Sequence, residues 1–464
     1  LLVDRRAALP LAGILAACGF KRFQAPSWRA YPAVEDYLGL DVATGALLHL
    51  HVHFALTLGE RFLKSYQLPW EDAVLAARRL DERGEIYVAD PRHELLLLLV
   101  RAALKLRTRD YLRAIFGRPG IPAGTLRELR WLEERVGREA LAEATRPLVG
   151  ERATELLLAM LGGRPSVQRL LALRRSVTPS LDEYRTYGAL EARCRRWGRA
   201  LHGVAARAAN RWLRAGWPTR RIRPQGGLVI ALVGPDGAGK STLTRAITHW
   251  LLWKVDAVQL YLGTGGAPAL RARRALVRAR ASLAPAGSRD HAVRGAESPE
   301  ATGATRYVRS PRPWPRRLWR LWLALSRARE ARVRLRRLRR LANRGMIIVC
   351  DRFPQQQFTR LNDGPLLTDW EAHEVPLLRA AARRERATFA AFAACAPDLV
   401  IKLCVEPQVA RRRRPEMTHE HLRAKAEAIA ATQYPASTRV VDVDASRPLE
   451  QVLLDVKRAV WASL

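Results

Sequence analysis

The chain has few cysteines, and none of them are spaced as a pair. The five cysteines are Cys18, Cys194, Cys350, Cys395 and Cys404. Because no C-x-x-C pair and no zinc-ligand spacing occurs among them, a disulfide framework and a zinc finger are both excluded. Scattered cysteines of this kind are typical of reduced core residues in a cytoplasmic protein.

Long hydrophobic runs are also missing. The most apolar stretch, Leu95 to Val100, lies between Glu94 and Arg101 and is far too short to cross a bilayer. The segment Leu9 to Cys18 makes a poor signal peptide because no basic region precedes it. The chain begins at Leu1 without an initiator Met, which fits a fragment of a longer protein. The sequence therefore predicts no membrane span.

Acidic residues are scarce beside basic ones, with 44 Asp and Glu against 80 Lys and Arg and a formal net charge of +36. Such a balance suggests an anionic partner, but nearly all of the positive charge is Arg, spread along the whole chain among many Ala residues. No nucleic-acid module accompanies it, so nucleic acid is not the favoured partner. The length of 464 residues and the 48% apolar content predict two or three domains with sizeable cores.

The strongest motif is Gly-Pro-Asp-Gly-Ala-Gly-Lys-Ser-Thr at Gly234 to Thr242, after the apolar run Leu228 to Val233. This is a complete Walker A loop, whose glycines let backbone N–H groups converge on phosphate oxygens. Lys240 would reach the β- and γ-phosphates and Ser241 would ligate Mg²⁺. ATP and Mg²⁺ are thus the expected cofactors. The predicted nucleotide-binding residues are Gly234, Asp236, Gly237, Ala238, Gly239, Lys240, Ser241 and Thr242.

Strand-like and helix-like segments alternate after this loop, which predicts an α/β fold, a doubly wound parallel sheet of the P-loop NTPase type. Strands are expected at Leu228–Val233, Val255–Leu262, Met346–Cys350, Asp398–Val405 and Arg439–Val443. Helices are expected at Thr242–Trp253, Leu318–Asn343, Asp369–Ala394, His419–Thr432 and Leu449–Ala462, with a long loop at Leu270–Trp314. We expect a small α+β domain over 1–115, a helical connector and linker over 116–225, and the P-loop domain over 226–464.

Two further elements favour phosphate chemistry. The strand Met346–Cys350 ends in Asp351-Arg352-Phe353, and a carboxylate at the carboxyl end of a strand beside a P-loop can hold Mg²⁺ while the adjacent Arg clamps a phosphate. After the segment Pro397–Leu403 the chain runs through Val405-Glu406-Pro407 into Arg411, Arg412, Arg413 and Arg414. Positioned cations of this kind can stabilise the charge of a transferring phosphoryl group.

Together the P-loop, the Asp351-Arg352-Phe353 element and the Pro397–Leu403 segment resemble the thymidylate kinase family over about residues 226–464. The resemblance implies a nucleoside monophosphate kinase, with dTMP as the first candidate acceptor of the ATP phosphoryl group. It implies that one of Arg411, Arg412, Arg413 and Arg414 is a catalytic Arg in a lid. It also implies that Asp236 contacts the acceptor sugar, that Arg352 binds the acceptor phosphate and that Lys240 binds the donor phosphates.

Two departures from that family concern the acceptor. Tyr261 to Gly266 stands where the family has Arg-Glu-Pro-Gly-Gly, and Pro354 to Phe358 replaces the elements that help to recognise thymine. Other interpretations therefore stay open: a kinase for another phosphorylated or hydroxylated metabolite, a nucleotide-sensing module with little turnover, or an ATPase associated with nucleic acid. A homodimer also stays open as the assembly state.

The first hundred residues carry a second resemblance. Leu1 to Arg6, Cys18-Gly19-Phe20, His49 to His53 and Pro91 to Glu94 resemble an uncharacterised nucleotidyltransferase-like family. The resemblance implies that the paired metal-binding acids precede Leu1, so a truncated or degenerate domain without catalytic residues is expected. Alternation along a strand places His49, His51 and His53 on one face. They form either a zinc site, for which the sequence shows no fourth ligand, or a polar strand face.

Overall fold

The computed structural model describes residues 1–59, 62–116, 120–162, 165–263, 314–359, 361 and 363–464. The predicted loop at 270–314 therefore lies outside the described residues except for its last position. The chain forms two compact units, the first containing residues 1–39 and 48–214 and the second containing residues 40–47 and 215–464. No helix in the described ranges is both long and apolar enough to cross a membrane.

The first unit begins with a small α+β part. Its sheet has the order β1-β2-β3, with antiparallel pairing of β1 and β2, and the alternation of the strands directs Tyr37 and Val52 into a core with Leu15 of helix α1. The elements are η1 (Arg5–Ala7), α1 (Ala8–Ala17), β1 (Lys21–Phe23), β2 (Val34–Leu40) and β3 (Leu47–His53). Next come β4 (Leu56–Leu58), β5 (Tyr66–Leu68), α2 (Glu71–Ala76), β6 (Arg79–Leu80) and β7 (Tyr87–Val88).

The rest of the first unit is helical and surrounds helix α3 (Pro91–Lys105), which begins where the Asp90 carboxylate accepts a hydrogen bond from the backbone N–H of Arg92. The other helices are α4 (Thr108–Ile115), α5 (Ala123–Glu133), α6 (Arg138–Val149), α7 (Glu151–Met160), α8 (Val167–Leu181), η2 (Asp182–Tyr184), α9 (Ala189–Ala208) and η3 (Ala209–Leu213). One hydrophobic core extends from Tyr66 to Leu181. The helices that follow residue 116 thus share a core with elements that precede it.

The second unit contains a five-stranded sheet in the order β12-β11-β8-β10-β9, and every neighbouring pair is parallel. The strands are β8 (Leu228–Val233), β9 (Ala257–Tyr261), β10 (Ile347–Asp351), β11 (Leu399–Cys404) and β12 (Arg439–Asp444). All residues of the central strand β8 are buried, as expected of a strand covered on both faces. The predicted α/β class and all five predicted strands are confirmed, although β9 is shorter than expected at both ends.

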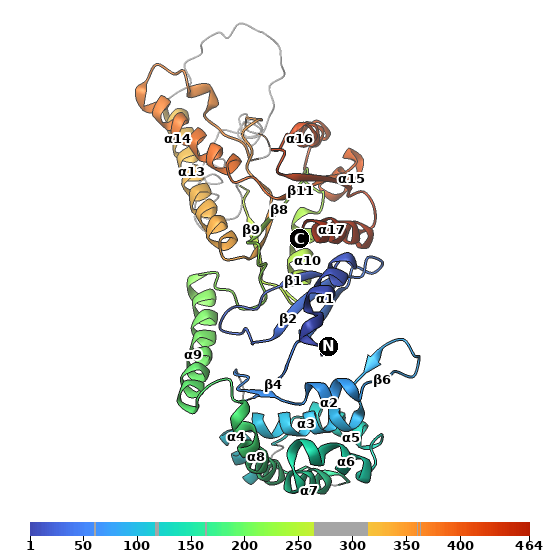
Figure 1. Cartoon of the computed structure of the whole chain (residues 1–464). Helices are drawn as coiled ribbons and strands as arrows, with labels where there is room; N and C mark the ends of the chain where they lie inside the picture. Colours follow the sequence, from blue (N-terminus) through green and yellow to red (C-terminus); the bar gives the residue numbers. More distant parts are fainter. Residues whose placement is uncertain (60–61, 117–119, 163–164, 264–313, 360, 362) are drawn as a thin grey trace. The chain divides into compact units, whose positions relative to one another are not determined.

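Helices cover both faces of this sheet (Figure 1). One face packs against α13 (Trp314–Ala342), the end of α14 (Pro376–Ala393) and α16 (His419–Ala431), which contribute Leu338, Phe392 and Ile429 to a shared core. Helices α10 (Lys240–Leu251) and α17 (Leu449–Ser463) contact each other and the strands from the opposite side. The described residues of this unit also form two short helices, η5 (Thr368–Trp370) and α15 (Pro407–Arg413).

One predicted helix was wrong at its start. The sequence predicts a helix over Asp369–Ala394, but α14 begins at Pro376, after the short turn of η5. Proline fits the first helical position and disfavours helical geometry in the residue before it. Val375 is accordingly extended, with φ −74° and ψ 117°.

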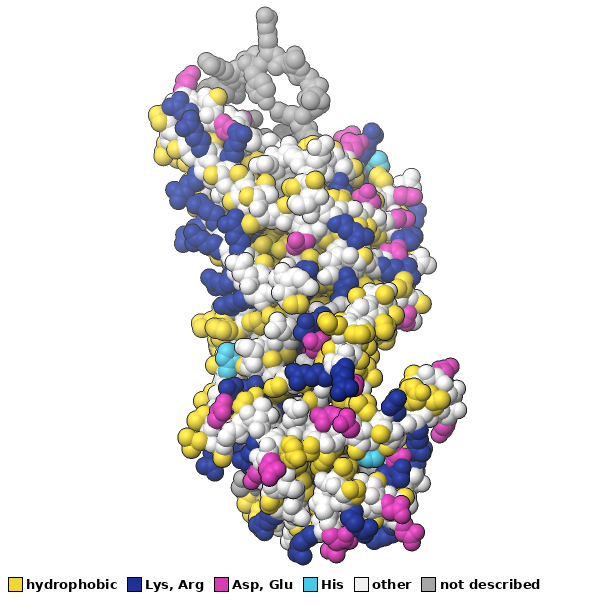
Figure 2. All heavy atoms as spheres, in the orientation of Figure 1, with side chains coloured by type: hydrophobic (Ala, Val, Ile, Leu, Met, Phe, Trp, Pro, Cys, Tyr) yellow, Lys and Arg dark blue, Asp and Glu magenta, His cyan; other side chains and the backbone are white. Residues whose placement is uncertain are grey.

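Helix α13 carries much of the positive charge of this unit on its exposed side. Arg329, Arg336, Arg339 and Arg340 are exposed there, whereas Leu338 and Leu341 face the core. Figure 2 shows Lys and Arg side chains gathered along the side of the molecule where Figure 1 places α13. These four arginines of the helix are thus solvated, whereas others, such as Arg332 and Arg334, are half-buried.

Candidate functional site

The loop between β8 and α10 is held in a tight path by its glycines. Gly237 and Gly239 adopt φ +88° and +81°, a left-handed region in which side chains are disfavoured. A Cβ atom at Gly237 would lie 2.9 Å from the carbonyl oxygen of Ala410, and one at Gly234 would lie 2.9 Å from that of Leu403. The loop therefore passes close beneath β11 and α15, and it leads into the N-terminus of α10, where backbone amides favour an anion.

Lys240 is the first residue of α10 and only 7% exposed. Its Nζ donates hydrogen bonds to the carbonyl oxygens of Gly234 at 2.8 Å and Pro235 at 2.7 Å. Burial and the nearby guanidinium of Arg352 lower the pKa of Lys240 to about 8. The ammonium group thus lies inside the loop against neutral carbonyl groups, where a phosphate would be a stronger partner.

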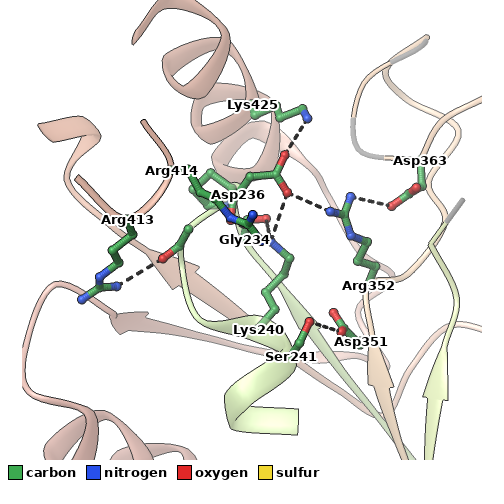
Figure 3. A network of polar contacts seen from close by, with 12 residues as sticks. Gly234, Asp236, Lys240, Ser241, Asp351, Arg352, Asp363, Arg413, Arg414 and Lys425 are labelled. Carbon is green, nitrogen blue, oxygen red and sulfur yellow. Dashed lines mark hydrogen bonds and ion pairs between the residues drawn. The ribbon is translucent and has the colours of Figure 1, made fainter. Parts of the chain in front are cut away.

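Ser241 and Asp351 meet at the carboxyl edge of the sheet (Figure 3). The Ser241 hydroxyl donates a hydrogen bond of 2.5 Å to Oδ2 of Asp351. Asp351 is 2% exposed, and its Oδ1 atom is buried without a hydrogen-bond partner in the described part of the chain. Buried carboxylate oxygens are rarely left unpaired. A hydroxyl beside a carboxylate with a spare oxygen fits Mg²⁺, which prefers oxygen ligands.

Asp236 lies among three cations in the same view (Figure 3). Its carboxylate accepts hydrogen bonds from Arg352 Nη2 at 2.8 Å and Lys425 Nζ at 2.7 Å, and it lies 3.9 Å from Lys240 Nζ. Burial alone would raise the pKa of Asp236, but Lys425 and Arg352 outweigh it and hold that pKa well below its ordinary value. Asp236 is therefore a fixed anion that offsets the mutual repulsion of the three cations around it.

Arg352 is fixed by both its side chain and its backbone. Its guanidinium also donates to Asp363 at 3.3 Å, and although burial would lower the pKa of Arg352, Asp363 and Asp236 raise it. Its φ of +69° is in the left-handed region, while its N–H donates to the carbonyl of Leu232 at 3.1 Å. Backbone strain of this kind persists where the surroundings over-determine a conformation, and it is common in functional sites.

The predicted lid arginines differ in their surroundings. Arg413 donates hydrogen bonds to the carbonyl oxygens of Gly237 at 3.2 Å and Ala445 at 3.1 Å, and Arg414 pairs with Glu416 at 3.2 Å. Arg411 and Arg412 are exposed, and their side chains form no ion pair or hydrogen bond within the described ranges. Arg413 thus contacts the P-loop directly, whereas the side chains of Arg411 and Arg412 are exposed to solvent.

Two residues of the site were not predicted from the sequence. Lys425 lies 189 positions after Asp236, in helix α16, where a single Lys looks like an ordinary surface residue. Asp363 follows β10 in a segment without regular structure. The only sequence signal for Lys425 is the scarcity of lysine in a chain whose cations are nearly all Arg.

Comparison with known proteins relates the chain to proteins described as ATP-binding. No protein-family profile matches it. The "Uncharacterized ATP-binding protein YghR" of Escherichia coli K12 is 27% identical over 237 residues, covering 50% of this chain and 86% of that protein. The "Uncharacterized ATP-binding protein YghS" of the same strain is 27% identical over 258 residues, covering 51% and 93%. A Candida albicans thymidylate kinase structure aligns with 51% of the chain and 90% of its own, at 14% identity and a TM-score of 0.29.

Proposed function

We propose that the second unit binds ATP with Mg²⁺ and transfers the γ-phosphoryl group to a small phosphorylated acceptor, with a nucleoside monophosphate such as dTMP as the first candidate. The observation that carries this proposal is the Ser241 to Asp351 contact with a spare, buried carboxylate oxygen beside Lys240. The description of the two E. coli relatives as ATP-binding supports the nucleotide.

Each group of the donor side has a defined task in this proposal. The glycine loop and the amides of α10 bind the phosphates, and Lys240 exchanges the carbonyl groups of Gly234 and Pro235 for phosphate oxygens. Ser241 and Asp351 would hold Mg²⁺, which when bound neutralises charge on the phosphate oxygens. Because the transferred group asks for little covalent help from the protein, catalysis depends mainly on these positioned charges.

The acceptor side is formed by the charges around Asp236. Arg352 and Lys425 offer two cations for an acceptor phosphate, while the carboxylate of Asp236 suits a sugar hydroxyl. A phosphate acceptor attacks through an oxygen that is already ionised near neutral pH, so no strong general base is required. This agrees with assigning Asp351 to the metal rather than to proton abstraction.

A second candidate is a kinase for a phosphorylated metabolite other than a nucleotide, and the glutamines after Arg352 favour it. Gln355 is buried and bonds to the backbone of Phe358 and Leu361. Gln357 bonds to both backbone groups of Gln433. Both side-chain amides thus bind backbone groups of this chain. They belong to the segment that replaces the thymine-recognition elements of the thymidylate kinase family, so neither amide is free to bind a thymine base.

The test is a turnover assay with the full chain. We expect ATP·Mg²⁺ with a panel of nucleoside monophosphates and sugar phosphates to yield ADP with one class of acceptor. Lys240→Ala should lose this activity, and Lys254→Ala, a lysine outside the site, should retain it. Tight ATP binding without turnover on any acceptor would favour a nucleotide sensor. A folded chain without magnesium-dependent affinity for any nucleoside triphosphate would refute both.

A further inference from the structure

The first unit brings together a cluster of possible metal ligands that lies outside the P-loop site. Strand β3 presents His49, His51 and His53 at alternating positions, and Asp36 lies on the neighbouring strand β2. Oδ1 of Asp36 is 2.9 Å from Nε2 of His49 and 3.0 Å from Nδ1 of His51. These three ligand atoms all lie within 4.8 Å of one another. Asp36 is the ligand that the histidine spacing alone did not reveal.

We propose that Asp36, His49 and His51 form a binding site for one divalent transition-metal ion of the zinc class. Two imidazole nitrogens and one carboxylate oxygen are a donor set that zinc uses in sites with three protein ligands. Ligand atoms about 2 Å from a tetrahedral ion lie roughly 3.3 Å apart. The two Asp36 distances are close to that separation, so a small movement of side chains makes room for the ion.

The surroundings suit a metal with an open coordination position. The side chains of Asp36 and His49 are 7% and 13% exposed, whereas that of His51 is 38% exposed. An ion held here would be shielded on the strand side and reachable beside His51, where a water or a small ligand can complete its coordination. His53 lies outside the set of ligand atoms, and its ring packs against that of His51 with centroids 4.7 Å apart. That contact limits rotation of the His51 ring.

The competing explanation is a hydrogen-bonded cluster without metal, in which both histidines donate to Asp36. That arrangement needs the proton of His49 on Nε2 and the proton of His51 on Nδ1. The metal site instead needs the lone pairs of the same two nitrogens directed inward. The two explanations therefore involve the same atoms of Asp36, His49 and His51. They differ in whether protons or a metal ion lie between these atoms.

The experiment uses the full chain, freed of metal with a chelator. We expect calorimetric titration with Zn²⁺ to give one tight site, Co²⁺ to give the visible absorption of a low-coordinate nitrogen and oxygen site, and Zn²⁺ to raise the melting temperature. Asp36→Asn and His51→Gln should each weaken Zn²⁺ binding by about 100-fold or more. Mutation of a residue that only hydrogen-bonds to a metal ligand already lowers metal affinity by about 10–100-fold.

Two control variants separate this site from others. Asp351→Asn removes the proposed Mg²⁺ ligand of the P-loop, and His249→Ala removes an exposed histidine of α10; both should retain the tight zinc site. Weak binding at many sites in the folded wild-type chain would overturn the proposal. So would tight binding that Asp36→Asn and His51→Gln leave unchanged. Asparagine keeps an oxygen acceptor for the histidines, so the hydrogen-bonded cluster predicts a folded Asp36→Asn chain and no tight zinc site in the wild type.

Discussion

Ser241 and Asp351 are 110 positions apart in the chain, yet the hydroxyl of one donates to the carboxylate of the other across 2.5 Å. Adjacent parallel strands bring them together, because β8 leads into the P-loop and β10 ends at Asp351, which is in register with Leu232. The hydrogen bond uses Oδ2 and leaves Oδ1 buried without a partner in the described chain. This pair is the observation on which the proposed Mg²⁺ site rests.

The first prediction concerns this pair. Ser241→Ala and Asp351→Asn should each weaken ATP affinity in the presence of Mg²⁺ by about tenfold or more, because the first removes an oxygen ligand and the second removes the negative charge of another. Affinity measured in a chelator should stay nearly unchanged, since the loop and Lys240 remain. Calorimetry under both conditions provides the test, with Ser463→Ala as the control. Equal losses with and without Mg²⁺ would show that the pair does not hold the metal.

A second prediction concerns the charge balance around Asp236. Asp236→Asn removes the anion shared by Arg352, Lys425 and Lys240, so these cations repel one another. We expect a loss of about 1–3 kcal/mol in the free energy of unfolding, less than for a fully buried pair because the Asp236 side chain is 20% exposed. Lys425→Met should cost less, since Asp236 keeps Arg352.

Inorganic phosphate provides the specific readout for that prediction. An anion that binds beside these three cations and replaces the lost negative charge should stabilise Asp236→Asn more than it stabilises the wild-type chain. Urea unfolding with and without phosphate measures the difference. If phosphate stabilises both chains equally, the three cations do not act as one anion-binding group.

The parts of this structure that could be predicted from sequence are those with a local pattern. The loop at Gly234 to Thr242 follows from residue spacing, and strands such as β8 and β10 follow from apolar runs. The sequence also predicts Ser241 and Asp351 as Mg²⁺ ligands, the first from the Walker A spacing and the second from its place at the end of a strand beside the P-loop.

Contacts that depend on tertiary packing left no such pattern. Lys425 looks like a surface lysine of an amphipathic helix until α16 folds beside the P-loop and directs it to Asp236. Asp36 likewise belongs to the histidine cluster only because β2 pairs with β3. Glu385 is a third case: its charge suggests an exposed side chain, but it lies on the buried face of α14 and is 2% exposed.

A third prediction separates the arginines of α15. Arg413 supports the P-loop through the carbonyl of Gly237, so Arg413→Ala should weaken ATP binding and turnover together. The side chains of Arg411 and Arg412 form no ion pair or hydrogen bond with the described residues. If one of them reaches the phosphoryl group only in the transition state, its replacement by Ala should lower kcat by about 10²-fold with ATP affinity nearly unchanged. Arg414→Ala, which removes a contact with Glu416, serves as the comparison.

Steady-state kinetics and equilibrium binding of ATP distinguish these cases. A drop in ATP affinity as large as the drop in kcat for Arg411→Ala and Arg412→Ala would exclude a role restricted to the transition state. Unchanged kcat in both variants would show that neither Arg411 nor Arg412 is the catalytic cation, and Arg352 and Lys425 would then be the next candidates.

A fourth prediction concerns Glu385 and the pH dependence of stability. Its Oε2 accepts hydrogen bonds from the backbone N–H groups of Leu366 at 3.0 Å and Leu367 at 2.8 Å. Burial raises the pKa of Glu385 above its ordinary value of 4.5, and the two N–H groups and the nearby arginines oppose this only in part. The folded chain therefore keeps a proton at a pH where the unfolded chain has released it.

The sign of the effect follows from that difference. The stability contributed by protonated Glu385 is complete below the ordinary pKa of 4.5 and is lost as the pH rises through the higher folded value. Glu385→Gln keeps an oxygen acceptor for both N–H groups and has no charge to bury. The free energy of unfolding of the wild type should thus fall relative to that of Glu385→Gln as the pH rises above 4.5, as measured by urea unfolding. Glu385→Ala should lose about 1–3 kcal/mol throughout because two buried donors are left unpaired. Glu450→Gln, at an exposed position, should show no such trend, and a difference between wild type and Glu385→Gln that is constant with pH would show that burial of this charge costs nothing.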